Sequence, residues 1–93
     1  MHEAGLARDL IQRAEETALA EGVRRVTAVT VRIGALAGVT GDHLREHFIA
    51  EAKGTMAEGA ALEVVEGPGD EAALADPHAM DVLLVGVEVE EGG

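Results

Sequence analysis

The chain begins Met1-His2-Glu3, and these three residues carry a set of metal ligands. The α-amine of Met1, the backbone nitrogen and imidazole of His2 and a further ligand from Glu3 can close around one ion. Imidazole suits Ni, Cu and Zn, and a nitrogen-rich tetragonal set favours Ni(II) or Cu(II) over Mg or Ca. The terminus therefore predicts a transition-metal site. Because His2 is bulky, Met1 is expected to be retained and to supply the amine.

Two further histidines, His43 and His47, lie four residues apart in a segment expected to be helical, with Glu51 one turn further on. At that spacing neighbouring Cβ atoms lie roughly 5–6 Å apart on one helix face, and two such histidines can share a metal ion. The same pattern describes an ordinary solvated polar face, so both interpretations stay open. His78 is either a surface side chain or an additional ligand for the site at His2.

The composition restricts the classes of function. Seven basic residues against 18 acidic residues give a net charge of −11, which argues against nucleic acid and anionic membranes as partners. The chain has no cysteine, which excludes disulfides and thiolate zinc sites. It also has no serine, so the two commonest nucleophiles are missing and an enzyme is not expected. With no signal peptide and no long apolar run, the cytoplasm is the expected compartment.

Hydrophobic periodicity predicts two helices that position these residues. Apolar residues at four-residue steps predict a helix over residues 4–21, which the following glycine ends. A second helix is expected over residues 42–53, with Thr40 or Asp42 as its N-cap. The core is expected to be thin, because Phe48 is its only aromatic residue. Support from a bound metal or a partner chain, including an oligomer, would fit such a core.

Period-two alternation predicts three strands, over residues 26–33, 62–66 and 82–89. Between the last two, residues 67–78 are expected to form a loop or a short helical turn. The fold class predicted is α+β in two layers, with two helices on one face of a three-stranded sheet. The order along the chain is α-β-α-β-β, and residues 1–93 are expected to form a single domain.

On these residues the chain resembles the HypA/HybF family, the nickel metallochaperones of [NiFe]-hydrogenase maturation. The resemblance lies in the opening MHE, the helix beginning LARDLI, the stretch VTAVTVRIG followed by ALAGV, then KGTMAEGAALEV, and finally VLLVGVEVEE. In that family the opening histidine is the nickel ligand, assisted by adjacent backbone nitrogens and the following glutamate. The resemblance implies these roles for His2 and Glu3, with the Met1 amine auxiliary. It also implies two partners, the nickel-handling GTPase of the pathway and the hydrogenase large subunit.

The chain departs from the family pattern between the second and third strands. The family ordinarily inserts there a zinc-binding segment with two Cys-x-x-Cys pairs, whereas this chain has only residues 67–80, hereafter the connector. The resemblance thus implies a HypA-like nickel-binding domain that binds Ni(II), with no zinc expected. Two other interpretations remain. One is a non-catalytic structural or interaction subunit of a hydrogenase-related assembly, and the other is a general divalent-metal buffer.

Overall fold

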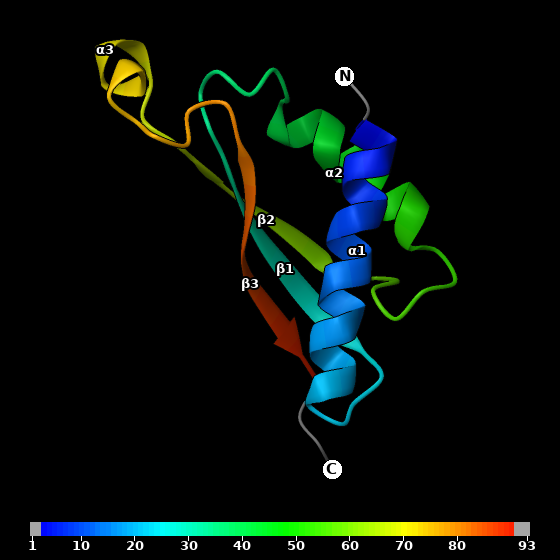
Figure 1. The fold of residues 1–93 in the computed structure, drawn as a ribbon. Coiled ribbons are helices and arrows are strands. Elements are labelled where there is room, and N and C mark those ends of the chain that lie inside the picture. The colour runs from blue at the N-terminus through cyan, green and yellow to red at the C-terminus, as the bar shows by residue number, and fades with distance from the viewer. Residues whose placement is uncertain (1–2, 91–93) are drawn as a thin grey trace.

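The computed structural model describes residues 3–90, which form an α+β fold of two layers. Along the chain the elements are α1 (Glu3–Ala20), β1 (Val26–Ile33), α2 (Gly41–Ala52), β2 (Ala61–Glu66), α3 (Asp70–Leu74) and β3 (Val82–Val89). The predicted arrangement of two helices on a three-stranded sheet is confirmed, because α1 contacts β1, β3 and α2, and α2 contacts β2. Figure 1 shows α1 running alongside the sheet with α2 packed against it. Within residues 3–90, no helix is both long and apolar enough to cross a bilayer.

The two long helices form where apolar residues recur on one face. The buried face of α1 consists of Ala7, Leu10, Ile11, Ala14 and Ala18. Helix α2 begins after Thr40, whose hydroxyl accepts a hydrogen bond from the His43 N–H at 3.2 Å. Thr40 is therefore the N-cap, one of the two predicted residues, and it satisfies a backbone donor that the helix leaves unpaired.

The sheet has the order β2-β1-β3, so β1 is its central strand. Strand β2 runs parallel to β1, and β3 runs antiparallel to it. The core lies between the sheet and the helices and depends on small and branched side chains. Its largest fully buried members are Phe48, Leu44, Val26, Val29 and Val31. Phe48, from α2, is the one aromatic side chain available to fill this layer.

The connector joins β2 to β3 at one end of the sheet. Ile33, the last residue of β1, pairs with Glu66 on one side and with Val82 on the other. The connector contains α3, a five-residue helix that adds one element to the predicted order, within the segment expected to form a loop or a helical turn. In Figure 1 this segment projects beyond the sheet, away from α1 and α2, and the molecule measures 47 × 22 × 15 Å.

Candidate metal centre

Of the three predicted metal ligands, the structure describes Glu3. Met1 and His2 fall outside the residues that the structure describes, so the terminal chelate stays a prediction. Glu3 is the first residue of α1 and is partly exposed. The first turn of a helix carries unpaired N–H groups and a local positive field. A carboxylate at this position offsets that field, which would otherwise disfavour a cation.

Packing and one ion pair fix the position of the helix that Glu3 begins. Ala7 and Leu10 are buried against the core within two turns of Glu3. Arg8 extends from the same part of α1 and places its Nε 2.8 Å from Oε1 of Glu51 on α2. The beginning of α1 is therefore held against α2 by both apolar and charged contacts.

The alternative site at His43, His47 and Glu51 is not assembled. Both histidines are exposed on α2, while the Glu51 carboxylate accepts the hydrogen bond from Arg8. In the part of the chain that the structure describes, no three or more His, Cys, Asp or Glu side chains come together to hold a metal ion. The exposure of His43 and His47 fits the solvated polar face that was the other interpretation of the pattern, and a metal shared by the two histidines alone stays untested.

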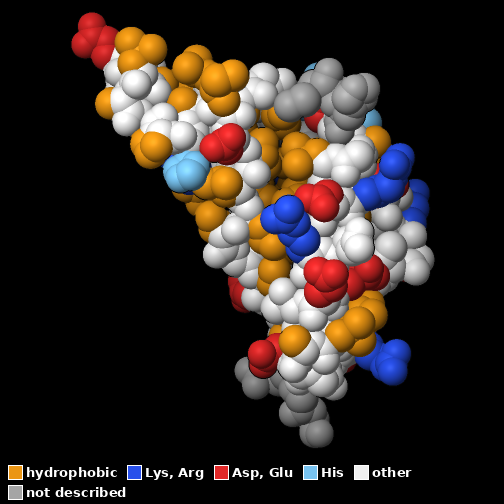
Figure 2. All heavy atoms as spheres, in the orientation of Figure 1, with side chains coloured by type: hydrophobic (Ala, Val, Ile, Leu, Met, Phe, Trp, Pro, Cys, Tyr) orange, Lys and Arg blue, Asp and Glu red, His pale blue; other side chains and the backbone are white. Residues whose placement is uncertain are grey.

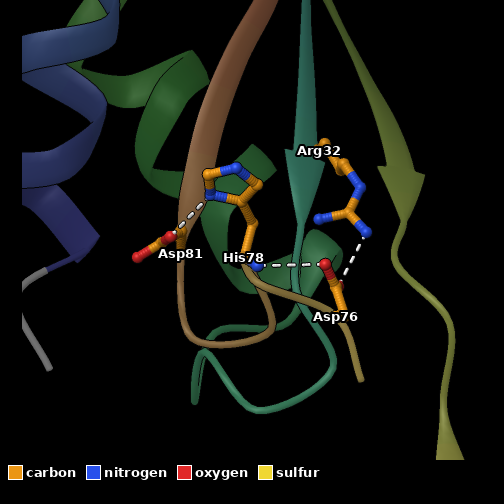
Figure 3. A network of polar contacts seen from close by, with 4 residues as sticks. All are labelled: Arg32, Asp76, His78 and Asp81. Atoms are coloured by element: carbon orange, nitrogen blue, oxygen red, sulfur yellow. Dashed lines mark hydrogen bonds and ion pairs between the residues drawn. The ribbon is translucent and has the colours of Figure 1, made fainter. Parts of the chain in front are cut away.

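His78 belongs to a polar network at the connector, as Figure 3 shows. Its Nδ1 lies 3.0 Å from Oδ2 of Asp81, and its backbone N–H donates to Oδ1 of Asp76 at 3.0 Å. Arg32, at the end of β1, donates from Nη2 to Oδ2 of Asp76 at 2.7 Å. His78 is thus exposed and has a carboxylate partner. Its other role, as an additional ligand for the site at His2, stays a prediction, because His2 lies outside the described residues.

The network fastens the connector to β1. The His78 N–H and then the Arg32 guanidinium hold the pKa of the Asp76 carboxyl below its ordinary range, because both stabilise the ionised form. Sequence reasoning missed this contact. Two signals were present: Arg32 is the one charged residue of β1, and Asp76-Pro77-His78 is typical of a turn in which the Asp side chain accepts from the N–H two residues on.

Comparison with known proteins connects the first three quarters of the chain to one family. The sequence profile described as "Hydrogenase/urease nickel incorporation, metallochaperone, hypA" matches residues 1–72. A hydrogenase maturation factor HypA from Azotobacter chroococcum mcd 1 is 48% identical over 69 residues, which are 74% of this chain and 61% of the relative. One from Roseiflexus sp. (strain RS-1) is 47% identical over 68 residues, 73% of this chain and 55% of the relative. The chain therefore matches about 60% of the length of these curated relatives.

The fold also has solved counterparts. The solution structure of the Ni metallochaperone HypA from Helicobacter pylori superposes with a TM-score of 0.76 at 18% sequence identity. The superposition covers 96% of this chain and 97% of that chain. The sequence profile ends at residue 72, whereas the structural match extends over nearly the whole chain. At this identity the superposition establishes a shared fold, which includes the third strand.

Proposed function

Because this chain belongs to the HypA family, we propose that it is a nickel-binding accessory protein that acts in [NiFe]-hydrogenase maturation. The observation that carries the proposal is the family match over residues 1–72, which includes the opening Met-His-Glu. The chain would act without catalysing a reaction, holding nickel as cargo. Its proposed partners are the nickel-handling GTPase of the pathway and the hydrogenase large subunit, with the cytoplasm as the place of action.

The proposed nickel site is the chain terminus itself. His2 would supply the essential imidazole, with the Met1 amine and the backbone nitrogens of His2 and Glu3 as further ligands. The Glu3 carboxylate would orient this set and counter the positive field at the start of α1. A nitrogen-rich set of this kind favours Ni(II) or Cu(II) over the hard cations that oxygen ligands prefer.

The proposed domain spans residues 1–93, with the connector in the place of the family's zinc module. Without cysteine, the chain offers no thiolate for a structural zinc ion. The connector instead reaches β1 through the ion pair between Arg32 and Asp76. We therefore propose that nickel is the only metal of this domain and that folding does not require zinc.

A second candidate function is a structural or interaction subunit that retains the fold without delivering nickel. It is favoured by the connector, which has no cysteine where the family pattern has its zinc-binding segment, and by a core with Phe48 as its only aromatic residue. A third, general buffering of divalent metals, rests on the net charge of −11. The three differ in nickel affinity and selectivity, so metal titration separates them.

The test is calorimetric titration of tag-free protein with Ni(II), Zn(II) and Mg(II). Tight binding of one Ni(II) per chain is expected, and His2→Ala should abolish it while the circular dichroism spectrum stays unchanged. The matched control is the double variant His43→Ala/His47→Ala, which removes two exposed imidazoles and should bind nickel normally. Extending the chain before Met1 should weaken binding, because the primary amine leaves its chelate position.

Three results would contradict the proposal. If His2→Ala binds nickel with unchanged stoichiometry and affinity, the terminal site is wrong. If the unaltered protein does not bind nickel, the structural-subunit alternative is supported. If several divalent metals bind with similar, weak affinity, the chain is a buffer.

A further inference from the structure

Large apolar side chains are exposed where the connector meets the loop after β1. Leu74 is 82% exposed, Met80 75% and Leu36 52%. We call these three residues the apolar tip. They line a hollow of about 420 Å³ whose remaining lining is Ala73, Asp76, Pro77, Ala79 and Asp81. Figure 2 shows hydrophobic side chains gathered over this projecting end of the molecule. Grouped exposed apolar side chains of this kind are typical of binding surfaces.

The backbone beneath the apolar tip is held in place. The Leu36 N–H donates to the Ala79 carbonyl at 2.8 Å, and the Gly34 N–H donates to the Asp81 carbonyl at 2.9 Å. With the Arg32–Asp76 ion pair, these bonds join the connector to the end of the sheet. A partner would therefore meet a preformed surface, which reduces the ordering cost of binding.

The apolar tip has an acidic border. Asp70 and Glu71 are exposed in the first turn of α3, and Asp81 is exposed on the other side of the hollow. Residues 66–81 contain five carboxylates and neither Lys nor Arg. Arg32, which contacts this segment from β1, is already paired with Asp76. The charge that complements this border is positive.

We propose that the apolar tip and its acidic border dock a partner protein through a segment in which apolar side chains are flanked by lysine or arginine. The apolar side chain would enter the hollow between Leu36, Leu74 and Met80. The basic residues would pair with Asp70, Glu71 and Asp81. These pairs would fix the position of the partner segment on the surface and raise its association rate. A second copy of this chain fits poorly, because it would bring two acidic borders together. The proposal concerns the end of the sheet and is independent of nickel.

The probe is a fluorescein-labelled synthetic peptide of leucines and lysines, with a peptide carrying glutamate in place of lysine as its control. Fluorescence anisotropy should show binding of the lysine peptide that weakens with added salt, and no binding of the glutamate peptide. Amide chemical shifts should change at Leu36 and in the connector. The double variant Asp70→Asn/Glu71→Gln should bind more weakly and with less salt dependence.

The decisive comparison uses paired apolar variants. Leu74→Ala/Met80→Ala should weaken peptide binding at least about tenfold, the scale expected when central apolar contacts are truncated. Leu19→Ala/Ile49→Ala removes side chains that are 51% and 56% exposed on the long helices and should leave binding unchanged. Equal affinities for both double variants would overturn the proposal. So would self-association in sedimentation equilibrium that Leu74→Ala/Met80→Ala abolishes, because a second copy would then be the occupant.

Discussion

Gly34→Ala should separate the connector from the end of the sheet. A Cβ at Gly34 would fall well inside the contact distance of the carbonyl oxygens of His78 and Ala79, which are backbone atoms. Neither oxygen can turn aside as a flexible side chain would. The two segments must therefore move apart by on the order of 1 Å before the contact becomes an ordinary one.

That movement sets the size of the effect. The hydrogen bond from the Leu36 N–H to Ala79 measures 2.8 Å, so a shift of this size lengthens it beyond bonding range. The bond from the Gly34 N–H to Asp81, at 2.9 Å, is weakened by the same movement. Two backbone bonds at about 0.5–1.5 kcal/mol each, with about 1–3 kcal/mol for overpacking, give a loss of roughly 2–6 kcal/mol. For a domain of this size, each kcal/mol lowers the melting temperature by about 4–8 °C.

Urea and thermal unfolding followed by circular dichroism at 222 nm measure the loss, and hydrogen exchange at the Leu36 amide reports the local bond. The matched control is Gly69→Ala in the same connector, where a Cβ meets nothing within 4 Å and the backbone φ is −98°. It should unfold like the unaltered protein. If Gly34→Ala keeps both its melting temperature and the protection of the Leu36 amide, the steric reasoning is refuted.

Three further predictions address the core, the ion pair and metal dependence. Phe48→Ala should destabilise the fold by about 3–5 kcal/mol in urea titrations, because Phe48 is fully buried, whereas Ile49→Ala, 56% exposed, should change little. The stabilising contribution of Asp76, whose folded-state pKa is lowered, is fully present above the usual carboxyl value of about 3.9 and is lost as pH falls below it. The urea midpoint of Asp76→Asn should therefore lie below that of the unaltered protein at about pH 6 and approach it at about pH 3. EDTA should leave the circular dichroism spectrum intact, and a large loss of ellipticity would reveal a structural metal.

The sequence predicted best those elements whose apolar residues recur at a regular spacing. The predicted strands 26–33 and 82–89 have the bounds of β1 and β3. The bounds of α1 and α2 lie one residue earlier than predicted, at Glu3–Ala20 and Gly41–Ala52. Where a whole face of a helix or strand is buried, apolar residues must recur at the spacing of that face. Their periodicity therefore predicts the element and its bounds well.

Features without such a pattern were harder to predict. Helix α3 buries only Ala73, so its five residues carry no periodic signal. Arg32 and Asp76 lie 44 positions apart in the sequence. They come together because β2 and β3 both pair with β1, and the alternation of apolar and polar residues within one strand does not predict that strand order. The proposed ligand His2 depends on chain position and resemblance alone, and it lies outside the described residues.

The pairing of Ile33 with both Glu66 and Val82 also determines how this fold can vary in length. The end of β2 and the start of β3 flank the end of β1, one on each side. The distance between them is therefore two strand spacings, or about 10 Å. Any segment whose ends match that gap can be inserted without altering strand register or the buried layer. Each doubling of such an insertion adds only about 0.6 kcal/mol of closure entropy. The length of the segment between β2 and β3 can thus change independently of the core.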